Sequence, residues 1–575
     1  MRKKIFFMAI IFVFSTIFIF GSFSSISSEE VVDYLIIYGG KNINDTISIK
    51  EFKESEGYKV KVVTIDEIES SVTGKDKGEK IRNFLKEKKD IWKFNYVLLI
   101  GSYTSIPQIK FYPLANKKDD ENEVIPSDFY YANLSDDFDS DKDKIIGEFV
   151  DDKFSYFPDV FIGRLLFTDK EGIDKYVENL KKYKENKNRN KALLLAAMLW
   201  FKGEYGDYPK DNCDGALTME IFKRGTLNNL NFETTTMYEK EGDAKSKYQS
   251  TYPLNLENVE KEIDNTYSFI GFFGHGDSGG VYRRIWNDGN KNEKFDKGED
   301  YWNSFLHRGV VEKNNISNAV IFAMGCLTAE TEKPNLAMSS LRYGAVGYIG
   351  ATRVAYGNPD SPASKELLYW GDRYFNYGET LGESLYFSKL DQSFSITSFY
   401  DQHNFFVFNL FGDPSISYFD EDYSIYPRNS TIKQKENKLI NINKIKGNGG
   451  KVEIYSDIPY EVSSNFLEDS LSISFKTSYK TKVGEYYINI KIGENYTTTI
   501  RVNVLENTLP YDLNDDGLVN INDFIIFSMS FMAKKGDENF NQRCDFNEDD
   551  VVNFSDFSIF AKNYKDWFIL IKFYN

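Results

Sequence analysis

The feature that most constrains the fold is a series of short apolar runs separated by amphipathic, helix-like segments, which begins at residue 31. Runs such as "DYLIIYGG", "NYVLLIGS" and "YSFIGFFGHG" are apolar almost throughout and end in glycine. Strands are apolar almost throughout when helices cover both faces of a mostly parallel sheet. We therefore expect an α/β region over residues 29–424, divided at about residue 185, with ligand sites beyond the carboxyl ends of the strands.

After about residue 425 the pattern changes to alternating apolar and polar residues with turn signals between the runs. The isoleucines of "INIKI" fall on one face, as do the apolar residues of "IRVNV", and "GEN" between these runs predicts a hairpin turn. This pattern favours a small β-sandwich of immunoglobulin-like type over residues 425–508.

Residues 509–566 contain an internal duplication, "DLNDDGLVNINDFIIF" and "DFNEDDVVNFSDFSIF", and each copy reads as a loop followed by a helix. Calcium takes six to eight oxygen ligands, which a 12-residue loop supplies from positions 1, 3, 5, 7, 9 and 12. The predicted ligands are Asp512, Asn514, Asp516, Leu518, Asn520 and Asp523 in the first loop, and Asp545, Asn547, Asp549, Val551, Asn553 and Asp556 in the second.

This twin loop resembles a dockerin module, with one departure: Asp550 stands at position 6 of the second loop, where the first has Gly517. The resemblance implies calcium-dependent folding and docking onto a cohesin domain. A calcium-stabilised tail without a cohesin partner is the alternative. We assign no role to the apolar tail at residues 567–575.

Two more acidic loops lie inside the α/β region, and both lack glycine at position 6. The first offers Asp137, Asp139, Asp141, Asp143 and Glu148; the second offers Asp288, Asn290, Asn292, Asp296 and Glu299. Their spacing predicts structural calcium sites that stiffen long surface loops. A solvated charged loop is the alternative for each.

A scarce histidine and a cysteine follow two of the apolar strands. His275 ends "FIGFFGHG" and Cys326 ends "AVIFAMGC", in a chain with three histidines and three cysteines. A thiol beside an imidazole makes a nucleophile and its general base. The neighbouring glycines let a substrate backbone approach, and the amides of Gly276 and Cys326 are candidate oxyanion donors. Taken singly, such a cysteine is usually a small buried apolar residue, and Gly-His-Gly is often a tight turn.

Together the two strands resemble the gingipain-type cysteine peptidases of the caspase-like clan, in which His-Gly and then Cys follow successive apolar strands. "YVLLIGSYTSIP", "FPDVFIGRL" and "NLFGDPSIS" extend the resemblance over roughly residues 31–420. Gly325 stands where alanine is usual, and the second acidic loop lengthens the interval from His275 to Cys326. The Gln-Ala-Cys signature of caspases is absent.

The resemblance implies an endopeptidase with a caspase-like fold, in which Cys326 attacks the scissile carbonyl and His275 protonates the leaving amine. Glu204 is a candidate for a third acid that orients the histidine. Asp214 is a candidate for the S1 pocket, which hints at Arg or Lys at P1. A plain helix N-cap is the alternative for Asp214.

The N-terminus predicts export. A basic "MRKK" precedes an apolar run and then small residues, which is typical of a signal peptide over residues 1–28. A retained membrane anchor is the alternative. Three cysteines do not make a disulfide framework, and a net charge of −17 argues against a nucleic-acid partner.

The sequence thus predicts a secreted cysteine endopeptidase that acts on peptides or proteins and is held by its dockerin on a cohesin-bearing extracellular complex such as a cellulosome. We expect structural calcium and no organic cofactor. The alternatives are a non-catalytic calcium-binding scaffold or adhesion protein on the same fold, and a transpeptidase that uses the same cysteine and histidine.

Overall fold

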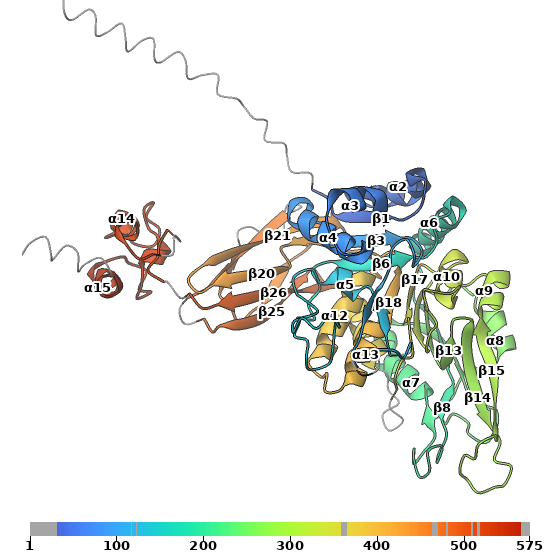
Figure 1. Ribbon diagram of the computed structural model, residues 1–575. Helices are drawn as coiled ribbons and strands as arrows, with labels where there is room; N and C mark the ends of the chain where they lie inside the picture. The colour runs from blue at the N-terminus through green and yellow to red at the C-terminus, as the bar shows by residue number, and fades with distance from the viewer. Residues whose placement is uncertain are drawn as a thin grey trace, which may run out of the picture.

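The computed structural model describes residues 31–564 except 115, 117, 122, 358–364, 463–469, 479–480, 508–509 and 515–517 (Figure 1). The predicted signal peptide and the apolar tail lie outside the described residues. Within the described ranges, no helix is both long enough and apolar enough to cross a membrane.

An eleven-stranded sheet forms the centre of the α/β region, in the order β11-β10-β7-β12-β16-β17-β18-β6-β3-β1-β2. The strands are β1 (Tyr34–Tyr38), β2 (Val60–Thr64), β3 (Tyr96–Ile100), β6 (Phe161–Leu165), β7 (Lys191–Ala196), β10 (Glu233–Tyr238), β11 (Tyr252–Pro253), β12 (Phe269–Phe273), β16 (Val320–Met324), β17 (Gly347–Ala351) and β18 (Phe408–Gly412). Every neighbouring pair is parallel except β17 and β18, which are antiparallel. The predicted mostly parallel sheet is therefore confirmed, and it consists of two parallel halves that run in opposite directions.

Helices surround this sheet (Figure 1), and strands such as β1, β3 and β16 are buried at every residue because both faces are covered. The helices are α2 (Ile47–Ser55), α3 (Ile65–Ser71), α4 (Lys77–Trp92), α5 (Phe129–Ala132), α6 (Lys170–Glu185), α7 (Ala216–Gly225), α8 (Leu256–Glu262), α9 (Arg308–Asn314), α10 (Leu336–Arg342), α11 (Lys365–Gly371), α12 (Leu381–Ser393) and α13 (Phe399–Val407). Helix α6 is typical: the Asp169 carboxylate caps its start by accepting from the Gly172 amide, and Ile173, Tyr176 and Leu180 fill its buried face.

The predicted β-sandwich follows. One sheet has the order β19-β21-β24-β23 and the other β20-β26-β25-β22. The strands are β19 (Asp422–Tyr426), β20 (Asn429–Lys433), β21 (Asn437–Lys446), β22 (Val452–Tyr455), β23 (Tyr460–Val462), β24 (Ser470–Lys476), β25 (Gly484–Ile492) and β26 (Tyr496–Leu505). The residues expected to share a face are all buried in its core: Ile488, Ile490, Ile492, Ile500, Val502 and Val504. The predicted hairpin connects β25 to β26.

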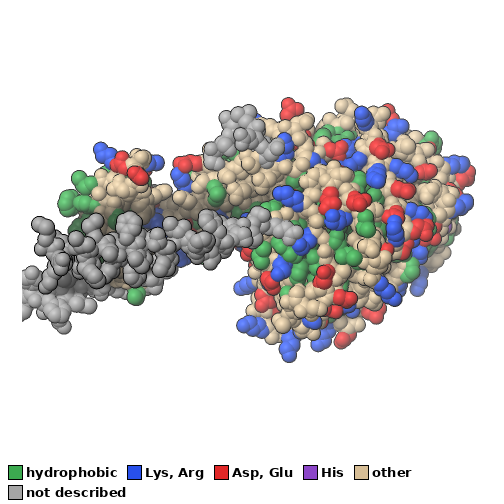
Figure 2. All heavy atoms as spheres, turned by 90° about the horizontal axis from the view of Figure 1, so that it is seen from above, with side chains coloured by type: hydrophobic (Ala, Val, Ile, Leu, Met, Phe, Trp, Pro, Cys, Tyr) green, Lys and Arg blue, Asp and Glu red, His purple; other side chains and the backbone are tan. Residues whose placement is uncertain are grey.

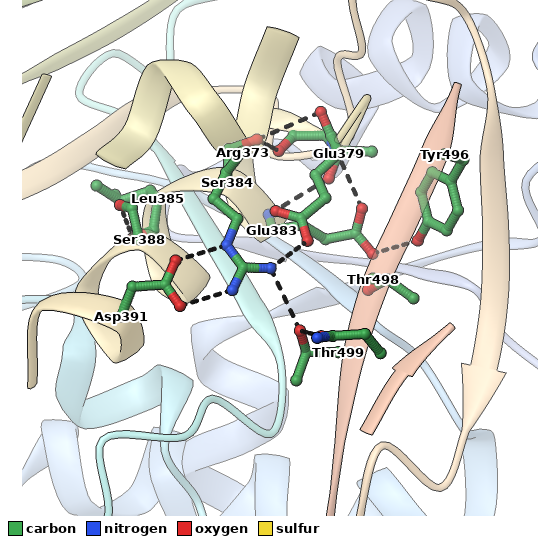
Figure 3. A network of polar contacts seen from close by, with 12 residues as sticks. Arg373, Glu379, Glu383, Ser384, Leu385, Ser388, Asp391, Tyr496, Thr498 and Thr499 are labelled. Atoms are coloured by element: carbon green, nitrogen blue, oxygen red, sulfur yellow. Dashed lines mark hydrogen bonds and ion pairs between the residues drawn. The ribbon is translucent and has the colours of Figure 1, made fainter. Parts of the chain in front are cut away.

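A buried polar network joins the sandwich to the α/β region (Figure 3). Arg373, between α11 and α12, makes two hydrogen bonds of 2.7 Å to the Asp391 carboxylate and one of 3.2 Å to the Thr499 hydroxyl on β26. Glu383 of α12 accepts from the Tyr496 hydroxyl at 2.7 Å and pairs with Arg428 at 2.5 Å. The Glu383–Arg428 pair is almost fully buried, so removing either partner alone would leave the other charge unpaired in a dry interior.

The C-terminal module contains α14 (Ile521–Ser530) and α15 (Phe554–Asn563), each beginning directly after an acidic loop. Phe527 and Phe560 stack at 5.4 Å between the two helices, and Cys544 is buried in the same small core. The module meets the sandwich through Lys435, whose ammonium group contacts the Asp545 carbonyl and lies 4.7 Å from the centre of the Phe546 ring.

Basic and acidic side chains are interspersed over the face of the α/β region seen in Figure 2. No surface of a single sign stands out on that face.

Candidate active site

The sheet brings His275 and Cys326 to the same edge. Strands β12 and β16 are neighbours, with Phe273 opposite Met324, and the Gly274 amide donates to the Met324 carbonyl at 3.1 Å. His275 and Cys326 each lie two residues beyond that pair, so the parallel register sets them side by side at the carboxyl ends of the strands.

At Gly276 the backbone of Cys326 leaves no room for a side chain. A Cβ atom there would lie 2.6 Å from the Cys326 carbonyl oxygen and 3.1 Å from its amide nitrogen. No larger residue fits without moving the backbone that carries Cys326. The glycine after the histidine is therefore required by packing, whatever part its amide plays in catalysis.

The imidazole of His275 is held from two sides. Its Nε2 lies 2.9 Å from the Leu199 carbonyl oxygen, and its ring centre lies 4.9 Å from that of Trp302. A carbonyl oxygen only accepts, so Nε2 carries the proton and Nδ1 is left as the basic nitrogen. Burial, and then the charge of Arg284, lower the pKa of His275 to about 4, so the imidazole is neutral at physiological pH.

The thiol of Cys326 is also uncharged. Its Sγ lies 3.6 Å from the Ala355 carbonyl, and burial raises its pKa above the usual value. The next residue, Leu327, has a φ of 60°, an uncommon conformation for a large side chain that marks a sharp turn directly after the cysteine. The pair is a neutral thiol and a neutral imidazole in this state, with no ion pair formed in advance.

Glu204, the candidate third acid, makes its hydrogen bonds to groups other than His275. Glu204 accepts from Arg284 at 2.6 Å and from the Phe201 amide at 3.0 Å. Asp300 holds the other side of the same guanidinium at 2.8 Å. The Leu199 carbonyl contacts the imidazole where we expected Glu204. Glu204 contacts the guanidinium of Arg284 instead. A backbone carbonyl has no side-chain signature, so the sequence pattern did not reveal it.

Asp214 lies in the short β9 (Cys213–Asp214), which pairs with β8 (Met198–Trp200), the strand that supplies the Leu199 carbonyl. Its carboxylate accepts from the Ala216 amide at 3.0 Å and from the Ser246 hydroxyl at 2.7 Å. It therefore does bond the start of α7 while lying beside the candidate site. The N-cap of α7 is Gly215, so Asp214 lies one residue before the cap and is not itself the N-cap. Its role in the S1 pocket stays a prediction.

In the second loop of the duplicated segment, residues 545–556, the acidic side chains converge and accept bonds from the loop's own amides. Oxygens of Asp545, Asp549 and Asp556 lie within 4.8 Å of one another. The closing Asp556 accepts from the amides at positions 2 and 9, and Asp545 at position 1 accepts from the amides at positions 5 and 6. Asp550 has a φ of 65°, so the departure from glycine at position 6 keeps the left-handed turn at the cost of some backbone strain.

The first dockerin loop is described only in part. Asp523 accepts from the Leu513 amide at 2.5 Å and from the Asn520 amide at 2.8 Å, again at positions 2 and 9. The predicted ligand Asp516 and its neighbour Gly517 lie outside the described residues.

The loop at 288–299 folds like the second dockerin loop. It connects β14 (Gly280–Trp286) to β15 (Asp300–His307), in the small sheet that begins with β13 (His275–Asp277). Glu299 accepts from the amides at positions 2 and 9, and Asp288 accepts from those at positions 5 and 6. Left-handed residues occur at positions 4 and 6 of both loops: Lys291 and Glu293 here, Glu548 and Asp550 in the dockerin.

The loop predicted at 137–148 has the same fold with a different register. The left-handed residues are Lys142 and Lys144, which places position 1 at Asp139 and not at Asp137. Asp152, absent from the prediction, is the closing carboxylate: it accepts from the Ser140 amide at 2.6 Å and the Gly147 amide at 2.8 Å. Two extra residues before this carboxylate explain why a 12-residue template missed it.

The class of protein follows from these observations and from comparison with known families. The chain is a cysteine peptidase with a C-terminal calcium-binding dockerin. It belongs to peptidase family C25, whose model matches residues 27–419, and residues 510–563 match the dockerin type I domain.

Solved structures are similar over most of the chain at low identity. The complex of Porphyromonas gingivalis RgpB pro- and mature domains is 15% identical, covers 82% of this chain and 100% of its own, and has a TM-score of 0.48. The Arg-specific cysteine proteinase gingipain R is 16% identical, covers 83% of this chain and 99% of its own, and also has a TM-score of 0.48. No curated protein matches the chain.

Proposed function

We propose that Cys326 and His275 form the catalytic pair of an endopeptidase, and that this pair becomes charged only when a substrate is bound. The observation that carries the proposal is their register at the carboxyl ends of adjacent strands, two residues past the Phe273–Met324 pair. Membership of the cysteine peptidase family supports the same assignment.

In the proposed reaction, the Cys326 sulfur forms a bond to the scissile carbonyl carbon, and the thiol proton passes to Nδ1 of His275. The oxyanion accepts hydrogen bonds from the amides of Gly276 and Cys326. The imidazolium then gives its proton to the leaving amine as the C–N bond breaks, and water hydrolyses the thioester.

A neutral resting pair fits this sequence of steps. Further loss of water would favour the neutral pair still more, so charge arises only as the sulfur attacks. Negative charge then passes to the oxyanion, which the backbone amides stabilise, while the imidazole takes the thiol proton. The Leu199 carbonyl accepts from Nε2–H and so stabilises the imidazolium in the same way that a carboxylate would, although more weakly.

We further propose that the enzyme is exported and attached through its dockerin to a cohesin on an extracellular complex, with calcium bound in both dockerin loops. The dockerin family match supports the partner and the ion. The loop at 288–299 is proposed to bind calcium as well, because its pattern of bonds and left-handed residues repeats that of the second dockerin loop.

Asp214 is proposed to line the S1 pocket and to favour Arg or Lys at P1. It is buried, its carboxylate accepts from the Ala216 amide and the Ser246 hydroxyl, and it lies on β9, which pairs with β8, the strand whose Leu199 carbonyl bonds His275. Burial raises its pKa, and a cationic P1 side chain would restore the charged form.

The test is labelling with acyloxymethyl ketone probes that carry Arg, Lys or Leu at P1. Wild-type protein should be labelled by the Arg or Lys probe, and Cys326→Ala should not. Equal labelling of both proteins would overturn the assignment of Cys326. Failure of every probe on calcium-loaded protein would favour the scaffold alternative, and ligated products with added amines would favour a transpeptidase.

A further inference from the structure

The insert between α5 and β6 contains a group of carboxylates that the proposed reaction does not use. Oxygens of Asp139, Asp141 and Asp152 lie within 4.8 Å of one another, as do those of Asp141, Asp143 and Glu148. The two groups share Asp141, so five carboxylates converge on one loop. Like charges this close repel one another unless a cation or protons lie between them.

Glu148 provides an independent indication of a ligand. Its side chain is only 4% exposed, yet its Oε2 has no hydrogen-bond partner among the described residues. A buried carboxylate oxygen without a donor costs free energy, and such groups in proteins are normally paired or bound to a metal. The charged groups that act on it are Asp141, Asp143, Asp151 and Asp152, all of the same sign, so a cation is the missing partner.

From this geometry we propose a calcium site in the peptidase region formed by Asp139, Asp141, Asp143, Glu148 and Asp152. All of its side-chain ligands would be carboxylate oxygens, which calcium prefers. Five carboxylates provide six or more contacts when some bind through both oxygens. The loop is a dockerin-type calcium loop with two residues inserted before its closing carboxylate. This site is separate from the dockerin sites and from the loop at 288–299.

The position of the site suggests what the ion holds in place. The loop pairs with the preceding segment through Tyr112 N–H to the Ile146 carbonyl at 2.9 Å and Phe149 N–H to the Pro113 carbonyl at 3.1 Å. On its other side, Gln402 of α13 donates to the Gly147 carbonyl at 3.3 Å. The ion would therefore tie the insert to two elements of the core.

One of those elements leads to the candidate active site. His403, the residue after Gln402, hydrogen-bonds the Val354 carbonyl at 2.7 Å. The following residue, Ala355, accepts a hydrogen bond from the Cys326 thiol through its carbonyl. Calcium at this site thus supports the segment that faces the proposed nucleophile. This last step depends on the proposed function, whereas the site itself does not.

The test uses the full chain carrying Cys326→Ala, which prevents self-digestion and removes activity from the readout. Trypsin cleaves after exposed lysines, and Lys142 and Lys144 lie inside the loop. Calcium-free protein should be cut after these lysines at least ten times faster than protein in excess Ca²⁺, with Mg²⁺ protecting less. Mass spectrometry identifies each cleavage site, so protection of this loop is measured separately from protection of the dockerin.

Two further variants make the test specific. Glu148→Gln should lose most of the calcium protection while becoming more stable than the parent in chelator, because it removes like-charge repulsion at a position where Oε2 has no donor among the described residues. Asp137→Asn should keep full protection, since Asp137 lies outside the corrected register. Calcium-independent cleavage of the parent, or unchanged protection in Glu148→Gln, would overturn the proposal. Loss of protection in Asp137→Asn with retention in Glu148→Gln would overturn the ligand set.

Discussion

The candidate active site and the dockerin differ in the charge of their functional groups. At the sheet edge, burial lowers the pKa of His275 and raises that of Cys326, so both groups are neutral. In the second dockerin loop, Asp545, Asp549 and Asp556 hold carboxylate oxygens within 4.8 Å of one another. The neutral thiol and imidazole are suited to binding an uncharged peptide bond, because charge develops only during the reaction. The clustered carboxylates are suited to binding a cation.

Cys326→Ala gives the largest expected effect and tests whether the two regions are functionally separate. We expect peptidase activity to fall by ~10³-fold or more, because the remaining groups cannot form a covalent intermediate. Cohesin binding, measured by calorimetry on the same protein, should not change. Weaker cohesin binding in this variant would mean that the two regions are coupled.

Asp556→Ala is the converse change. Removing the closing carboxylate should weaken calcium binding by the second dockerin loop by at least about 10- to 100-fold and abolish tight cohesin binding at low calcium. The matched control is Asp537→Ala, an acidic residue outside the two loops, which should bind cohesin normally. The rate of peptide hydrolysis should be the same in both variants, and a slower rate in Asp556→Ala alone would contradict the separation.

Arg284→Gln tests how the neutral imidazole is maintained. The guanidinium charge is the second cause of the lowered pKa of His275, after burial. Its removal should raise the pKa from about 4 toward the ordinary value of 6.5 without reaching it. An NMR titration of the imidazole protons measures this shift directly. Glu204→Gln leaves the cation in place and should not raise the pKa, and an equal rise in both variants would contradict the assigned cause.

The smallest expected effect is on stability in acid. The folded pKa of His275 lies below the ordinary value, so the unfolded chain takes up a proton first as the pH falls. The contribution of the neutral imidazole is therefore complete above pH 6.5 and is lost between about 6.5 and 4. Urea unfolding of His275→Gln and wild type across this range should show a difference that changes with pH. A constant difference would mean that the imidazole is not buried as described.

Much of the molecule could be predicted from residue patterns. The apolar runs ending at Gly274-His275 and Gly325-Cys326 predicted adjacent parallel strands, because uninterrupted apolar strands need cover on both faces. The alternation at Ile488, Ile490 and Ile492 predicted a half-buried sheet, and helices α14 and α15 begin where the duplication placed them.

What could not be predicted depends on contacts between distant parts of the chain. The pairing of Glu204 with Arg284 joins residues 80 positions apart, and no local spacing signals it. The carbonyl that holds His275 belongs to a backbone with no sequence signature. The register of the loop at 139–152 depends on where its left-handed residues fall, and lysine at those positions conceals a turn that glycine would have marked.

The buried pairs between α12 and the sandwich have a mechanical consequence. Each buried pair fixes one orientation of the sandwich against α12, because a rotated interface would bury the Glu383 and Arg428 charges without their partners. The sandwich and the α/β region therefore move as one rigid piece, and a displacement of the sandwich is passed on to the α/β region instead of being taken up at their interface.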